Sequence, residues 1–145
     1  MREILFRGKR LDNGEWVEGG YNYKKVGGYF TDVFIIEHLT DGVCECHNVD
    51  PDTVGQYTGL CDKNGRKIFE GDMFRMDEDD IAVVIFKDGC FRLEIHGLCG
   101  TWTESGFDEC GGGYGIIECD PIDWYYIKDM DVIGNIHDNS DLLKD

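Results

Sequence analysis

Four Asx-Gly dipeptides punctuate this chain, and they constrain its fold more than any other feature. Asn and Asp tolerate a positive φ angle and glycine adopts it freely, so these pairs favour tight reversals between antiparallel strands. Each pair lies between apolar or alternating segments, which predicts a chain built mainly from β-hairpins. The four pairs are Asn13-Gly14, Asp41-Gly42, Asn64-Gly65 and Asp88-Gly89.

The segments that flank these pairs predict the strands. Residues 4–11 and 16–23 are expected to form the first hairpin, and a two-residue turn at Asn64-Gly65 is expected to form another. Alternating or β-branched patterns mark further strands at residues 29–39, 43–49, 56–60, 66–69, 81–86, 90–95 and 131–136. In contrast, the glycine run at 111–115 predicts a flexible connection rather than a strand.

Helix signals are few. Asp50-Pro51-Asp52-Thr53 predicts one helical turn with Asp50 as its N-cap, and residues 120–124 and 139–143 predict two more. No longer window repeats its apolar residues every 3.6 positions. We therefore expect a mainly β fold, a small barrel or sandwich built from hairpins, whose C-terminal part could be SH3-like.

Charge divides the chain unevenly. The net charge is -16, of which residues 77–145 carry -13, whereas residues 1–25 carry +2. The composition changes near residues 72–80, which predicts an N-terminal β subdomain at 1–72 and an acidic C-terminal β subdomain at 73–145. The boundary is soft, so a single domain is the alternative. A basic head and an acidic rear could attract one another, within one chain or between copies.

The same charge limits the partners. Nucleic acids and anionic membranes repel so acidic a chain, because phosphate binding depends on Lys and Arg. The longest apolar run has six residues, at 81–86, whereas a membrane helix needs about 20. The first residues show no signal peptide, so we expect a cytoplasmic protein.

Seven cysteines are present, an odd number that argues against a disulfide framework. Cys44, Cys46 and His47 are the candidate metal ligands, because thiolates and imidazoles bind zinc. Their spacing is not Cys-x-x-Cys, no second pair completes four ligands, and Cys44 and Cys46 face away from His47 in a strand. The acidic run at 77–80 lacks the ligand spacing of an EF-hand. We therefore expect no metal and no cofactor.

The sequence contains no catalytic constellation. The glycine run lacks the Gly-Lys-Ser/Thr ending of a phosphate loop, and neither Ser105 nor Ser140 lies in a Gly-x-Ser-x-Gly elbow. A cysteine nucleophile would need a histidine base, and the pattern singles out no pair among the cysteines and the histidines at 38, 47, 96 and 137. We expect that the protein is not an enzyme.

Several stretches together resemble the YopX family of phages and prophages of bacteria. The most specific is VDPDTVGQYTGL at 49–60, continued by CDKNGRKIFEGD at 61–72. Supporting matches are REILFRGK at 2–9, GEWVEG at 14–19 and VIGNIHDN at 132–139, whereas residues 97–127 match least. The resemblance implies a mostly β fold and self-association. The biochemical activity of the family is not established, so no catalytic or binding residue carries over.

Two functional hypotheses follow. The first is a non-enzymatic phage or prophage accessory protein that forms a homo-oligomer or binds a host or phage protein. The alternative is an acidic decoy that mimics DNA and occupies a host DNA-binding protein. A mimic needs carboxylates in an ordered row, and Asp129 with Asp131, or Glu118 with Asp120, would share one strand face.

Overall fold

A computed structural model describes the backbone of residues 1–76, 78, 80–103, 106–121 and 127–143, with side chains outside 30 and 98–121. Backbone contacts divide the chain into an N-terminal unit, Met1–Gly59, and a C-terminal unit, Leu60–Asp145. This boundary, between residues 59 and 60, lies before the one expected from the change in composition. The subdomains at 1–72 and 73–145 therefore stay a prediction. In the described part, no helix is long and apolar enough to cross a bilayer.

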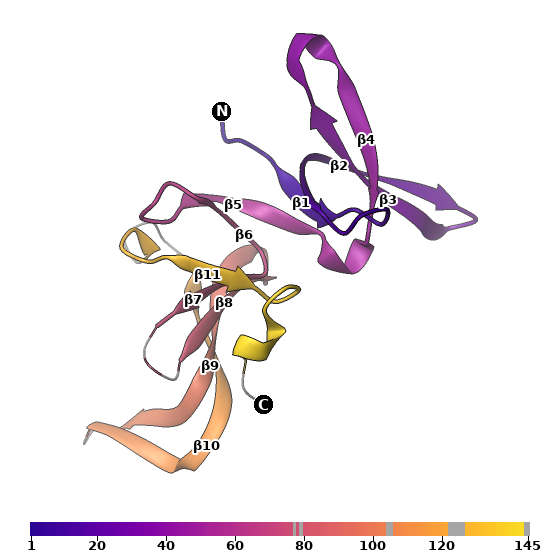
Figure 1. Ribbon diagram of the computed structural model, residues 1–145. Helices are drawn as coiled ribbons and strands as arrows, with labels where there is room; N and C mark the ends of the chain where they lie inside the picture. The colour runs from indigo at the N-terminus through magenta and orange to yellow at the C-terminus, as the bar shows by residue number, and fades with distance from the viewer. Residues whose placement is uncertain (77, 79, 104–105, 122–126, 144–145) are drawn as a thin grey trace. The chain divides into compact units, whose positions relative to one another are not determined.

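Antiparallel strands dominate both units, which confirms the mainly β prediction (Figure 1). One sheet has the order β4-β3-β2-β1-β5-β6, with β6 in the C-terminal unit, and the other has the order β10-β9-β8-β7-β11. The strands of the first sheet are β1 Phe6–Lys9, β2 Trp16–Val26, β3 Tyr29–His38, β4 Cys44–Val49, β5 Gly55–Cys61 and β6 Lys67–Phe69. Those of the second are β7 Asp72–Arg75, β8 Ile81–Lys87, β9 Cys90–Thr103, β10 Gly106–Pro121 and β11 Val132–Asn135.

Both sheets are open, so the barrel alternative was wrong, including an SH3-like barrel in the C-terminal part. A barrel closes only when its first and last strands pair with each other. Here β10 and β11 lie at opposite ends of their sheet, and β4 lies at the end of the first.

The Asx-Gly turns form at all four predicted places, but they do not share one geometry. Asp88 and Gly89 both have positive φ, and Lys87 pairs with Cys90, as a two-residue hairpin turn requires. At the second pair, Asp41 and Gly42 also have positive φ, within the 3₁₀ turn η1 Thr40–Gly42. At Asn64-Gly65 only the glycine does, so the expected two-residue turn was wrong and the loop is longer.

Asp62 is the reason for the longer loop. Its buried side chain accepts hydrogen bonds from the backbone N–H groups of Asn64 and Arg66, both at 2.9 Å, while its own N–H binds the Arg66 carbonyl. The other carboxylate oxygen accepts from the Val132 N–H at 3.2 Å. One carboxylate therefore shapes this turn and joins it to the start of β11.

Two of the predicted helical turns are confirmed. Pro51–Thr53 forms the 3₁₀ turn η2, and the Asp50 side chain caps it by accepting from the Asp52 N–H at 3.0 Å. Ser140–Leu142 forms η3 near the C-terminus. Of the third, Pro121 ends β10, and residues 122–124 lie outside the described part.

The glycine-rich segment at 111–115 corrects our prediction of a flexible connection, because it lies within β10. This strand pairs with β9, and the two form the longest hairpin of the chain (Figure 1). Their register shifts between Glu109 and Tyr114, where the three consecutive glycines stand. Glycine suits such an irregularity, since it adopts backbone angles that other residues avoid.

Each unit has its own core. The N-terminal unit buries Val17, Val33, Ile35 and Val49. In the C-terminal unit the apolar run that begins at Ile81 is buried on both faces of its sheet: Ala82 and Val84 pack with Phe74, whereas Ile81 and Val83 pack with Met73. A continuous apolar run is typical of a strand that is covered on both sides.

A lysine strengthens the link between the Asp62 turn and β11. Lys63 Nζ lies 2.7 Å from Asp131 Oδ2, and Asn64 Nδ2 also donates to Asp131. The hydrogen bond from Lys63 is the largest cause that lowers the pKa of Asp131. The carboxylate should therefore stay ionised below its ordinary range in the folded chain.

We expect a ¹³C NMR titration of Asp131 to show a midpoint below that of an unperturbed Asp. A carboxyl with a lowered folded pKa contributes stability above its unfolded pKa, and that contribution disappears as the pH falls through the folded pKa. Because both side chains are exposed, the effect on overall stability should be slight. Lys63→Met should raise the midpoint towards the ordinary value; an unchanged midpoint would contradict the ion pair.

Candidate functional site

The candidate metal ligands of the sequence lie on β4 but face opposite ways. Cys44 and Cys46 are exposed, whereas His47 is only 9% exposed. Adjacent residues of a strand point to opposite faces, which confirms the separation predicted from the pattern. The structure therefore does not bring Cys44, Cys46 and His47 together at one point.

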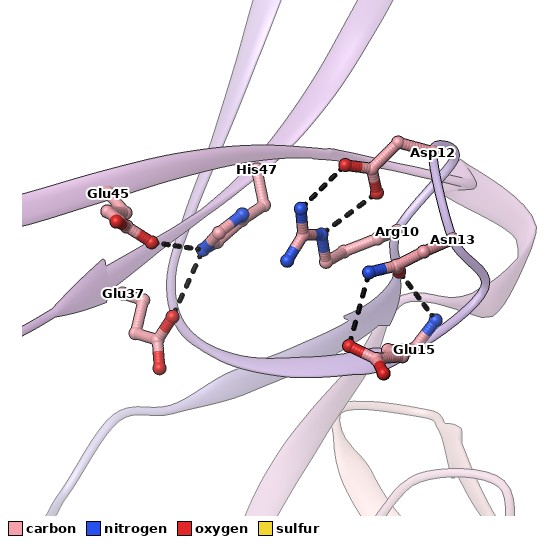
Figure 2. Close-up of polar contacts among 7 residues, drawn as sticks. All are labelled: Arg10, Asp12, Asn13, Glu15, Glu37, Glu45 and His47. Atoms are coloured by element: carbon pink, nitrogen blue, oxygen red, sulfur yellow. Dashed lines mark hydrogen bonds and ion pairs between the residues drawn. The ribbon is translucent and has the colours of Figure 1, made fainter.

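His47 instead meets two glutamates (Figure 2). Its Nε2 lies 3.0 Å from Glu37 Oε2 and 3.5 Å from Glu45 Oε2. The pairing of β3 with β4 explains this, because Glu37 lies directly opposite Glu45 and Ile35 directly opposite His47. The three donor atoms all lie within 4.8 Å of one another.

Sequence reasoning did not select either glutamate. Glu45 lies between Cys44 and Cys46, but only the thiols and the imidazole of this motif were considered as metal ligands. Glu37 is ten positions from His47, and only the strand register brings it close. Strand alternation could have identified Glu45, because residues 45 and 47 lie on the same face of any strand at 43–49.

The turn between β1 and β2 places further charges nearby (Figure 2). Arg10 binds Asp12 through two hydrogen bonds, of 2.9 Å from Nε and 2.6 Å from Nη2. This contact lowers the pKa of Asp12 and raises that of Arg10, to which the charge of Glu45 also contributes. Asn13 accepts from the Glu15 N–H and donates to its carboxylate at 3.1 Å, which orders the turn.

An open depression of about 400 Å³ lies beside this group. Arg10 and three carboxylates, those of Glu15, Glu18 and Glu37, line it together with Trp16 and Val17. The lining is mainly charged, whereas pockets for small organic molecules are mainly apolar. The depression suits an ion or a charged group better than an organic substrate.

Several other cysteines, histidines and acidic residues that the sequence analysis considered make local contacts where the structure describes them. Cys44 Sγ lies 3.2 Å from His38 Nδ1, and both residues are exposed at a hairpin end. His96 binds Glu94 at 2.7 Å. The acidic run connects β7 to β8, as expected; residues 77 and 79 lie outside the described part.

The motifs that resemble the YopX family build turns. The block at 49–72 contains the Asp50 cap and the Asp62 turn, and it ends at the fully buried Asp72, which accepts from the Phe69 N–H at 2.8 Å. At the C-terminus Asn135 accepts from the N–H groups of His137 and Asp138, both at 3.0 Å. The Asp and Asn side chains of these motifs accept hydrogen bonds from backbone N–H groups, and this role in shaping turns accounts for the residue types found there.

Comparison with known proteins identifies the family. The profile of the family described as "YopX protein" matches residues 5–144. Protein EF1440 from Enterococcus faecalis, known from a crystal structure, is 24% identical over 99% of this chain and 100% of its own, with a TM-score of 0.47. No protein with a curated description matches. Because the matched region covers almost the whole chain, this protein belongs to the YopX family.

Proposed function

We propose that the protein is a non-enzymatic interaction module of a phage or prophage that forms a homo-oligomer in the bacterial cytoplasm. The observation that carries this proposal is a strip of exposed aromatic side chains on the β2–β3 hairpin. This aromatic strip consists of Tyr21 and Tyr23, which share one face of β2 and have exposed fractions of 40% and 48%. Val26 and Tyr29, with exposed fractions of 55% and 79%, pair with each other at the hairpin tip and face the other side.

The aromatic strip has the properties of an interface. The rings of Tyr21 and Tyr23 lie 5.9 Å apart, and Phe6 continues the row at 5.2 Å from Tyr21. Tyrosines offer a large contact area at a small entropic cost, and they are enriched in interfaces between proteins. A row of neighbouring rings is more informative than single exposed apolar residues, which are common on any surface.

Charge favours a second copy as the occupant. Lys24 and Lys25 follow Tyr23 directly in β2 and are exposed. The C-terminal unit of the chain carries a net charge of -12, against -4 for the N-terminal unit. A basic hairpin end on one copy and an acidic unit on another attract each other, which steers association.

Light scattering coupled to size exclusion tests this proposal. We expect the chain to be larger than a monomer at micromolar concentrations and to dissociate as salt screens the charges. Tyr21→Ser combined with Tyr23→Ser should give a monomer, whereas Phe86→Ser, which alters an exposed ring of the C-terminal unit, should not. A wild-type monomer at all these concentrations would contradict the proposal.

The acidic decoy remains the alternative, although one of its two predicted rows was wrong. Asp129 and Asp131 precede β11 instead of sharing a strand face, and Asp131 binds Lys63. Glu118 and Asp120 do lie on one strand, β10. Capture of a host nuclease or methylase by the wild-type chain would favour the decoy over self-association.

A further inference from the structure

We propose that Glu37, Glu45 and His47 form a binding site for a divalent transition-metal ion of the zinc class. The site lies on the β3–β4 hairpin, and it differs from the thiol site that the Cys44-Glu45-Cys46-His47 motif suggests. It also replaces our expectation that the chain binds no metal.

The strand register places two carboxylates side by side. Glu37 and Glu45 are directly opposite each other in an antiparallel pair. Like charges in this arrangement destabilise a sheet, whereas an opposite-charge pair stabilises it. Here both carboxylates turn towards one imidazole nitrogen, which can donate only one proton (Figure 2). A metal ion at this point would bind all three groups and remove the repulsion.

The distances suit a metal ion. Zinc binds histidine nitrogen and carboxylate oxygen at about 2.1 Å. With bonds of this length, the 3.0 Å and 3.5 Å separations from Nε2 correspond to ligand–metal–ligand angles of about 90° and about 110°. These angles are close to those of octahedral and tetrahedral coordination, and the exposed glutamate side chains can rotate to bring their two oxygens to the distance that one ion requires.

Burial gives the site one rigid ligand and two adaptable ones. The side chain of His47 is 8% exposed, so packing holds the ring, whereas Glu37 and Glu45 are 41% and 56% exposed. The open side leaves room for water as a fourth ligand. A nitrogen with two carboxylates suits zinc better than calcium or magnesium, which prefer oxygen alone.

The surrounding charge also favours a cation. Glu15 and Glu18 line the depression that Glu37 borders. Arg10, the one cation in that lining, binds Asp12 through two hydrogen bonds and also feels the charges of Glu15 and Glu45, so the carboxylates outnumber it. A divalent ion would therefore enter a region of negative potential.

Zinc content after dialysis, together with the visible spectrum of the Co²⁺-loaded chain, tests the site. We expect about one zinc per chain for the wild type and loss of the metal in His47→Gln. Glu45→Gln should weaken binding at least about tenfold. Because Glu45 is exposed and the change removes like-charge repulsion, this variant should fold at least as stably as the metal-free wild type.

Two matched controls separate this site from its neighbours. Glu15→Gln alters a carboxylate of the same depression that does not contact His47, and should keep the zinc. Cys44→Ser combined with Cys46→Ser should keep it too, because those thiols lie on the opposite face. A wild type that retains no zinc, or zinc that is lost with the thiols but kept in Glu45→Gln, would overturn the proposal.

Discussion

Phe74→Ala is expected to reduce the free energy of unfolding of the C-terminal unit by about 3–5 kcal/mol. Phe74 has no exposed surface and packs against the buried residues of its core, among them Ile68, Val84 and Leu93. The substitution removes a ring from a close-packed interior, and the strands on either side cannot collapse fully into the space. Since small domains have a total stability of about 5–15 kcal/mol, this single change is a large fraction.

Chemical denaturation followed by circular dichroism measures this loss. Phe86→Ala is the matched control, because it is the same change on the neighbouring strand β8 at a side chain that is 50% exposed. Phe86 contacts Phe91 with ring centres 5.1 Å apart, so we expect the control to lose less than about 1.5 kcal/mol. Equal losses in the two variants would show that the core is not where the structure places it.

Gly19→Ala is expected to destabilise the N-terminal unit by at least about 1–3 kcal/mol. A Cβ atom at this position would lie 2.0 Å from the carbonyl oxygen of Ile36. The obstacle is backbone of the paired strand β3, so a side-chain rotation cannot relieve the overlap. The pairing of β2 with β3 must shift instead, and this pairing supports both the aromatic strip and Glu37.

Gly20→Ala is the control, because a methyl group added there would have no atom within 4 Å and the backbone is not in the left-handed region. We expect it to be neutral or slightly stabilising, since alanine reduces the conformational entropy of the unfolded chain. Thermal unfolding of both variants checks the contrast. If Gly19→Ala unfolded at the wild-type temperature, the close approach of β2 and β3 would be contradicted.

Local chemistry explains which features could be predicted. The positions of the four Asx-Gly turns and of the Asp50 cap depend on residues within a few positions of one another, and all of them form. The geometry of the Asn64-Gly65 turn could not be predicted in this way. It depends on Asp62, whose carboxylate also binds the distant Val132 N–H.

The candidate site was only half predictable. Alternation separates Cys46 from His47 in any strand, and the structure agrees. Glu37 could not be found, since its approach to His47 depends on how β3 pairs with β4. The glycine run was misread for a related reason: glycine weakens a strand locally, but pairing with β9 holds this segment extended.

Three features could be predicted from the residues along the chain: the mainly β class, the places where the chain reverses and the membership of the YopX family. These features are local, or they are carried by motifs that can be read along the chain. Three other features depend on how distant strands pair: β1 lies beside β5, both sheets stay open, and two glutamates meet one histidine. Such outcomes depend on the register between distant strands, where a shift of one residue would turn every side chain to the other face.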